Sequence, residues 1–430
     1  MATQPAAWPP AGSMALVTGI PDSSCGKRAG RLAASPSADR SSVFRQLDGT
    51  DEIYYRAYGK YQAGVTWHHT NTVGATKRWT GPVARVRFAH GCASHTRKEA
   101  AMQAIAETLR GLGLGPASGF VNLRVYPLLA PGLRARDYLT LAEALERGTV
   151  VVTEISEGGS VPELLLDNRG DAKVLLLDGE DLIGAKQNRV LNISILVGAK
   201  RKVKIPVSCV EHGRWRRSSA GMRSGESVLS PLSRSYSASE VSVSMSLTGM
   251  RRSNQGRVWS DVDTTLRTFV CDSDTGALSD IYEQQRSRLD EYVRSVRVVR
   301  DQVGVVFELN GEVLGMDLFD ATDSLARLLP RLVKSYALDA IEHPGAGDAR
   351  ANPLQVSAFL EQVAVAPTQV FPSTDLGQDV RFTGESIMGG ALVEDGRVIH
   401  LVAFSRQAVE RGRRGADASV WARGRMQEAG

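Results

Sequence analysis

Two stretches of strict apolar alternation, at residues 189–197 and 203–209, constrain the fold of this chain more than any other feature. Every second side chain of a β-strand faces the same side, so each stretch predicts a strand with one buried face. Residues 198–201 predict a turn between them, and the two strands are therefore expected to pair as a hairpin. The apolar positions are Leu191, Ile193, Ile195 and Val197 in the first stretch and Val203, Ile205, Val207 and Cys209 in the second.

Two further hairpins are predicted nearer the C-terminus. Asn310-Gly311 and Asp395-Gly396 tolerate the positive φ angles of a type I′ turn, so residues 303–319 and 391–404 are each expected to form a hairpin. The Ser- and Arg-rich residues 216–257 contain few large apolar groups and predict a long loop. Strand patterns outnumber alternating strand–helix units, which favours an α+β fold over a doubly wound sheet.

These patterns divide the chain into four parts. Residues 1–115, rich in Ala, Pro, Ser and Gly at their start, predict a poorly ordered N-terminal extension with one helix near 97–110. Residues 116–270 predict a β-rich, sandwich-like domain that contains the long Ser/Arg loop. Residues 271–405 predict a smaller α+β domain of hairpins and helices, and residues 406–430 an Arg-rich tail.

Composition excludes some classes of protein. No run approaches the ~20 apolar residues of a membrane span, and the N-terminus lacks the basic region of a secretory signal. Four widely spaced cysteines without a CxxC pair favour a reducing compartment, so a cytoplasmic location is expected. The net charge of +5 is dispersed along the chain and does not favour nucleic-acid binding. His90, Cys92 and His95 match no standard zinc spacing, so no metal site is predicted.

The densest group of polar side chains within predicted β-structure lies at residues 178–189 and 211–215. A turn at residues 198–201 would bring these two segments to the same end of the hairpin. Arginine binds phosphate through two parallel hydrogen bonds, and an indole stacks on planar rings, so this group suits a phosphorylated, nucleotide-like ligand. Glu180 and Glu211 are the candidate acid–base residues. The candidate ligand-binding residues are Asp178, Lys186, Gln187, Asn188, Arg189, Arg214 and Trp215.

Structural roles for the same residues remain open. Asp178-Gly179 also suits a hairpin turn, and Glu211 with Arg214 suits a structural ion pair. Cys209 lies on the apolar face of its strand, so a buried, unreactive thiol is expected there. The competing hypothesis is a non-catalytic adaptor or assembly module that contacts a protein partner through the Arg-rich loop or tail.

Two segments of the cluster closely resemble a known family. The sequences LLLDGEDLIGAKQNRVLNISILV at 175–197 and IPVSCVEHGRW at 205–215 are similar to the bacterial ARG and Rhodanese-Phosphatase-superfamily-associated protein domain. The resemblance extends from about residue 118 to about residue 405. It implies gene neighbourhoods with ADP-ribosylglycohydrolases and rhodanese-phosphatase-like proteins, and hence a ligand related to ADP-ribose or NAD. It implies no particular reaction or cofactor.

Overall fold

The computed structural model describes residues 98–132, 135–345 and 352–411, together with the backbone of a few short elements before residue 98. The chain divides into two compact units, Met1–Thr96 and Arg97–Gly430. The first contains three short paired strands, β1 (Val17–Thr18), β2 (Arg45–Gln46) and β3 (Glu52–Tyr54). The predicted helix near 97–110 belongs to α1 (Ala89–Arg110). Most of the predicted N-terminal extension, the side chains of His90, Cys92 and His95, and residues 412–430 of the tail lie outside the described residues.

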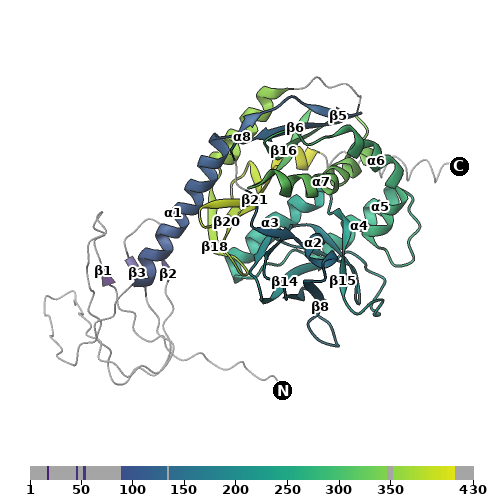
Figure 1. Ribbon diagram of the computed structural model, residues 1–430, viewed down its shortest axis with the longest axis horizontal. Coiled ribbons are helices and arrows are strands. Elements are labelled where there is room, and N and C mark those ends of the chain that lie inside the picture. Colours follow the sequence, from purple (N-terminus) through teal and green to yellow (C-terminus); the bar gives the residue numbers. More distant parts are fainter. Residues whose placement is uncertain are drawn as a thin grey trace, which may run out of the picture. The chain divides into compact units, whose positions relative to one another are not determined.

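The second unit has a mixed α+β fold, as predicted, and its largest element is a nine-stranded sheet (Figure 1). Helices α1 and α8 (Pro353–Val365) pack on one face of this sheet through a continuous apolar core. β6 pairs with β16, so the sheet joins a strand from the predicted first domain to strands of the second. The strands are β4 (Gly113–Leu114), β5 (Ser118–Phe120), β6 (Leu123–Leu129), β16 (Gln302–Leu309), β17 (Glu312–Phe319), β18 (Thr368–Pro372), β19 (Gln378–Phe382), β20 (Ile387–Glu394) and β21 (Arg397–Ser405).

Both C-terminal hairpins form as predicted. β16 pairs with β17 and β20 pairs with β21, each across a two-residue turn. Asn310 and Gly311 have φ angles of 52° and 83°, and Asp395 and Gly396 have φ angles of 48° and 74°. The turn residues therefore adopt the left-handed conformations that a type I′ turn requires.

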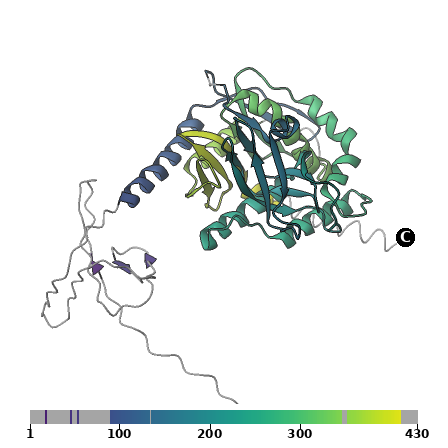
Figure 2. The same ribbon diagram turned by 60° about the horizontal axis from the view of Figure 1, so that its bottom comes forward.

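A six-stranded sheet and a three-stranded sheet enclose a second core (Figure 2). The short helix α2 (Leu141–Glu146) adds to this core, and a capping box between Thr140 and Glu143 begins it. The six-stranded sheet contains β8 (Val150–Glu154), β9 (Glu163–Asn168), β11 (Glu180–Gly184), β12 (Arg189–Leu191), β14 (Lys202–Cys209) and β15 (Met222–Val228). The three-stranded sheet contains β7 (Tyr138–Thr140), β10 (Lys173–Leu176) and β13 (Ile195–Val197).

Helices α3 to α7 form a third core with the remaining faces of these sheets. α7 packs against both β15 of the six-stranded sheet and β16 of the nine-stranded sheet. The helices are α3 (Pro231–Thr248), α4 (Gln255–Thr268), α5 (Leu278–Gln284), α6 (Arg286–Ser295) and α7 (Thr322–Glu342). None of the helices in the described part of the chain has the length and apolar character that crossing a bilayer requires.

The predicted loop at 216–257 is wrong, because this segment contains β15, α3 and the start of α4. Pro231 occupies the first turn of α3, and Gly249, with a φ of 72°, ends it, which is the usual helix asymmetry. The hydroxyls of Ser242 and Ser246 find partners within the helix, since each donates to the carbonyl four residues earlier. Tertiary burial of Ala238, Val241 and Met245 outweighs the weak helical preference of serine.

The predicted hairpin of residues 189–209 forms only near its open end. β12 pairs with β14, but β13 leaves the six-stranded sheet and pairs with β10. Asn192 and Ser194, which alternate with the apolar residues of the first stretch, are buried at this crossing. Asn192 Nδ2 donates to the carbonyl of Arg251, and Ser194 Oγ accepts from the backbone N–H of Asp178. Buried polar partners therefore hold the chain where it changes sheets.

Candidate functional site

The strand register places the two predicted polar segments together. Arg189 of β12 lies directly opposite Cys209 of β14, so residues 186–189 and 209–215 meet at one end of the six-stranded sheet. β12 and β14 pair in this way although the segment between them contains β13, which pairs with another sheet. The sequence prediction of convergence is therefore confirmed for Lys186, Gln187, Asn188, Arg189, Glu211, Arg214 and Trp215.

Glu211 anchors the polar end of this group. Its two oxygens accept hydrogen bonds from Nε and Nη2 of Arg214 at 2.7 and 2.6 Å, and also from the backbone N–H of Asn188 and the hydroxyl of Thr275. Burial alone would raise the pKa of Glu211, but these hydrogen bonds outweigh it and lower the pKa. Such an ionised, fully partnered carboxylate is suited to hold Arg214 in place, and its acid–base role stays a prediction.

Arg189 is the least satisfied charged group of the cluster. Its side chain is fully buried, at 0% exposure, and Nη1 donates to Oε1 of Gln187 at 2.9 Å. Its Nε and Nη2 atoms have no hydrogen-bond partner among the described residues. Burial lowers the pKa of Arg189, while Cys209, Glu154 and nearby Glu211 act in the opposite direction. A buried donor without a partner costs about 1–3 kcal/mol, so Arg189 would gain from any acceptor that reaches it.

Trp215 and a glycine-containing segment lie over Arg189. The indole, 49% exposed, has the guanidinium carbon of Arg189 at 5.8 Å and Nζ of Lys186 at 5.3 Å from its ring centroid. Nζ of Lys186 also donates to the carbonyl of Gly158. Gly159 has a φ of 77°, and a Cβ there would lie 3.4 Å from the Trp215 ring. Glycine adopts this left-handed conformation without strain, so it allows the chain to turn beside the indole.

Glu154, which the sequence did not single out, completes the group. It ends β8 on the same buried face as Val150 and Val152. Oε1 accepts from the backbone N–H of Lys186, whereas buried Oε2 has no partner within the described residues. The sequence did contain a signal for Glu154, because this acidic residue lies on the apolar face of an alternating strand. We refer to Glu154, Lys186, Arg189 and Trp215 as the Arg189 cluster.

The matching family covers this cluster. A model of the ARG and Rhodanese-Phosphatase-superfamily-associated Protein (ARPP-1) domain matches residues 111–404, more than half of the chain. The chain belongs to this family. No curated protein and no solved structure matches it.

Two of the predicted residues lie elsewhere in the ARPP-1 domain. Glu180 is buried beside α7, where it accepts hydrogen bonds from Arg331 at 2.8 Å and Ser224 at 3.1 Å. Asp178 lies between the sheets rather than in a hairpin turn, because β10 and β11 on either side of it pair with different strands. Among the described residues, neither Glu180 nor Asp178 makes a hydrogen bond or ion pair with the Arg189 cluster.

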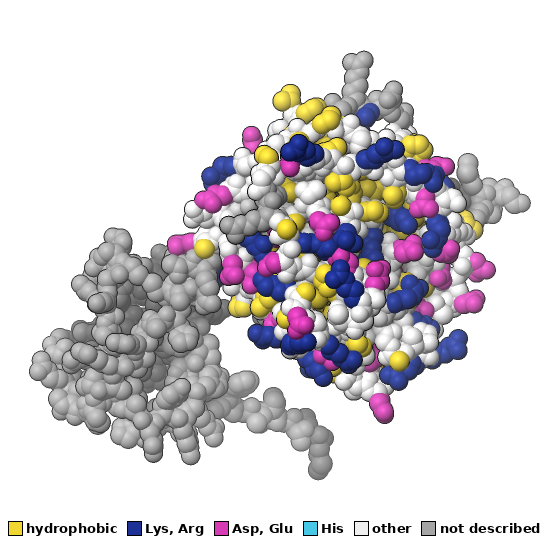
Figure 3. Space-filling view, in the orientation of Figure 1, with side chains coloured by type: hydrophobic (Ala, Val, Ile, Leu, Met, Phe, Trp, Pro, Cys, Tyr) yellow, Lys and Arg dark blue, Asp and Glu magenta, His cyan; other side chains and the backbone are white. Residues whose placement is uncertain are grey.

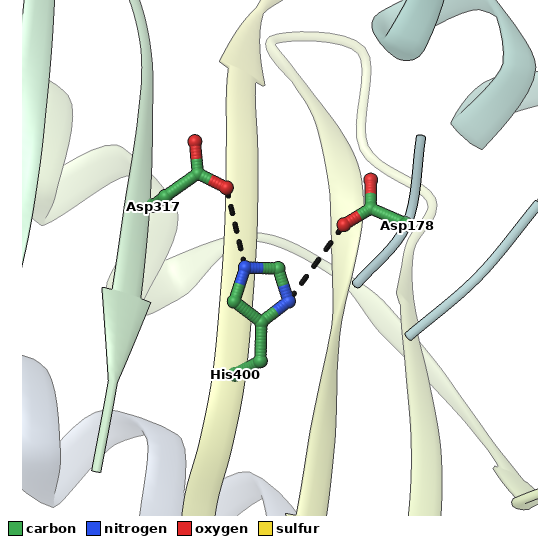
Figure 4. A group of neighbouring side chains, drawn as sticks. All are labelled: Asp178, Asp317 and His400. Carbon is green, nitrogen blue, oxygen red and sulfur yellow. Dashed lines mark hydrogen bonds and ion pairs between the residues drawn. The ribbon is translucent and has the colours of Figure 1, made fainter. Parts of the chain in front are cut away.

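Asp178 belongs instead to a buried charge network between two sheets. Asp317 of β17 and His400 of β21 face Asp178, and the His400 ring lies between the two carboxylates (Figure 4). Arg234 of α3 donates to Asp178 at 3.0 Å and to Asp317 at 2.8 Å. We refer to these four residues as the Arg234 network. The Ser-rich sequence around Arg234 did not indicate the role of this residue.

The Arg234 network has ligand types that suit a divalent cation, but a buried guanidinium already contacts both of its carboxylates. Burial lowers the pKa of Arg234, but Asp178 and Asp317 outweigh it, so the net shift is upward. Arg234 and His400 in turn overcome the effect of burial on Asp317 and lower its pKa. One Nη2 atom contacts both carboxylates, so a metal there would be placed against a buried guanidinium. The four residues fit a structural role that joins the sheets.

Basic side chains are mixed with acidic ones on the face of the molecule that Figure 3 displays. In the described part of the chain, Arg286 pairs with Glu226 and Glu283, and Arg397 pairs with Asp137 and Asp320. A nucleic-acid surface needs a continuous basic strip to bind phosphates. This face does not supply one.

Proposed function

We propose that this ARPP-1 protein binds a phosphorylated, nucleotide-derived small molecule at the Arg189 cluster. One observation carries the proposal: the Nε and Nη2 atoms of the buried Arg189 have no hydrogen-bond partner among the described residues, and they lie below the half-exposed ring of Trp215. The guanidinium fork matches the geometry of a phosphate, and the indole offers a flat surface for a nucleobase.

The surrounding charges support the same class of ligand. Lys186 adds a second cation beside the indole, and Arg214 is held nearby by Glu211. Oε2 of Glu154, which lacks a partner in the described part of the chain, is an acceptor that a ribose hydroxyl can satisfy. Since Arg189 is fully buried, the ligand reaches it when Trp215 and residues 158–159 move apart. The association of the family with ARG proteins makes ADP-ribose and NAD the first compounds to try.

Thermal unfolding of the full chain in the presence of ADP-ribose, NAD and mononucleotides tests this proposal. At a ligand concentration near 100 times the dissociation constant, binding to the native state adds about 2.7 kcal/mol of stability, and the unfolding temperature rises. We expect one of these compounds to raise it. We expect the shift to disappear in Lys186→Ala/Arg189→Lys, each protein being compared with its own ligand-free state.

Two further variants separate ligand binding from general destabilisation. Trp215→Ala removes a half-exposed ring, so the fold should tolerate it while the ligand-induced shift falls. Arg217→Ala removes an exposed arginine close in sequence and should leave the shift unchanged. A shift that persists in the double variant, or no shift with any compound, would contradict the proposal. The second result would favour the adaptor hypothesis.

A further inference from the structure

A cleft lies on the face of the six-stranded sheet opposite to the Arg189 cluster. Leu182 of β11 is the register partner of Arg189 of β12, so these two side chains lie on the same face of the sheet. Asp181 precedes Leu182 in β11, and its side chain therefore lies on the opposite face. The cleft beside Asp181 has a volume of about 330 Å³ and lies among β11, β15, α5, α6 and α7. Its lining combines acidic and basic side chains with the apolar side chain of Ile183 and the ring of Tyr282.

Asp181 is a buried carboxyl group that lacks one partner. Its side chain is 1% exposed, and Oδ2 accepts from the hydroxyl of Ser227 at 3.1 Å. Oδ1 has no hydrogen-bond partner within the described part of the chain. A Cβ on Gly225 would lie 2.5 Å from Oδ2, so only glycine lets β15 pass this close to the carboxyl group. The cleft therefore contains an unused acceptor at its inner end.

The cations around the cleft differ in how they are engaged. Arg286 pairs with Glu226 and Glu283, and Lys334 pairs with Glu226 and Asp290. Arg223, which is exposed, makes no ion pair or hydrogen bond with the described residues through its side chain. The cleft thus has one available anion-binding group.

An apolar stretch separates the available acceptor from the available donor. Arg223 lies opposite Ile183 in the strand register, and Ile183 is two residues beyond Asp181 on the same face of β11. Two residues of a strand span about 7 Å. The ring of Tyr282 borders the same space, and its hydroxyl is engaged with the carbonyl of Val228.

We propose that the Asp181 cleft is a second ligand site, and that it binds a short amino acid. The protonated amine donates to Asp181, a short aliphatic chain lies along Ile183, and the carboxylate pairs with Arg223. The site is separate from the Arg189 cluster and does not depend on the function proposed there.

The protonation state of Asp181 gives this site a pH dependence. Burial raises the pKa of Asp181 to about 7, although Ser227, Arg223 and Arg331 act against it. The amine binds to the ionised carboxylate, so affinity falls as pH drops below about 7. Charged and titratable groups near Asp181 come from β11, β15 and the packed helices: Glu180, Arg223, Glu226, Asp280, Tyr282, Glu283, Arg286, Arg331 and Lys334.

Calorimetric titration of the full chain with β-alanine, γ-aminobutyrate and δ-aminovalerate tests the proposal. Butyrate and butylamine serve as matched compounds that each lack one charged group. We expect at least one amino acid to bind at millimolar concentration or below, and both matched compounds to bind at least tenfold more weakly. At pH 6, we expect its affinity to be about tenfold lower than at pH 8.

Asp181→Asn keeps the shape of the side chain and removes the carboxylate, so we expect loss of binding at every pH. Arg223→Gln should weaken binding of the amino acid at least tenfold, and Arg217→Gln, at an exposed position outside the cleft, should not. Unchanged affinity in Asp181→Asn, or absence of binding by all three amino acids, would overturn the proposal.

Discussion

Replacing Arg234 by methionine is expected to lower the free energy of unfolding by about 3–5 kcal/mol. Arg234 is buried and contacts the carboxylates of both Asp178 and Asp317. Methionine fills much of the same volume but leaves two buried carboxylates without a guanidinium. Because these charges are then uncompensated, the loss of stability is larger than the net contribution of the intact ion pairs. Urea unfolding followed by circular dichroism measures the difference.

Two comparison proteins isolate the buried charge as the cause. Arg286→Met removes an arginine that also contacts two carboxylates, but its side chain is 47% exposed, so water screens these contacts and the loss should be much smaller than in Arg234→Met. Adding Asp178→Asn and Asp317→Asn to Arg234→Met removes the uncompensated charges and should recover part of the lost stability. If Arg234→Met and Arg286→Met were equally mild, the network would not stabilise the fold.

The Arg234 network also joins the three-stranded sheet, the nine-stranded sheet and helix α3 of this domain. Asp178 follows β10 of the three-stranded sheet, Asp317 and His400 belong to the nine-stranded sheet, and Arg234 comes from α3. Apolar packing tolerates small shifts between layers, whereas the guanidinium accepts only a narrow range of carboxylate positions. The network therefore specifies how these elements meet.

Local signals in the sequence were sufficient for the hairpins. Asn310-Gly311 and Asp395-Gly396 determine their own backbone conformation, and the flanking strands then pair by short-range contacts. The capping box at Thr140 and Glu143 is equally local. The α+β class could be predicted because the number and type of helices and strands are visible in the sequence without knowledge of how they pack.

Long-range burial explains the errors. The Ser-rich segment folds as α3 because Ala238, Val241 and Met245 have cores to enter, which the sequence around them does not reveal. Asp178 was grouped with Arg189 because the two are close in sequence, but the chain changes sheets between β10 and β11. Lys186, Arg189, Glu211 and Trp215 were grouped correctly, since strand register alone brings their segments together.

The division of the chain near residue 270 stays a prediction, although β6 and β16 pair across it. Glu154 and Arg234 were missed for different reasons. Glu154 interrupts an apolar alternation and was visible in principle. The importance of Arg234 depends on partners 56 and 83 residues away in sequence, so no local pattern could identify it.

Asp181→Asn is expected to stabilise the protein increasingly as pH rises from about 4 to about 7. The folded state raises the pKa of Asp181 from 3.8 to about 7, so between these values the folded chain holds a proton that the unfolded chain has released. Stability then falls with rising pH by about 1.4 kcal/mol per pH unit, or about 4 kcal/mol across the window. Asparagine does not ionise, so the variant avoids this loss.

Comparing the change with pH, rather than stability at one pH, removes any constant effect of the new amide group. Urea unfolding of both proteins across pH 4–8 should show a difference that grows up to about pH 7 and then levels. Asp317→Asn should show a nearly constant difference over the same range, because the pKa of Asp317 is lowered from 3.8 and its pH-dependent contribution to stability lies below about pH 4. A flat profile for Asp181→Asn would mean that Asp181 is ionised in the folded protein, with a partner at Oδ1.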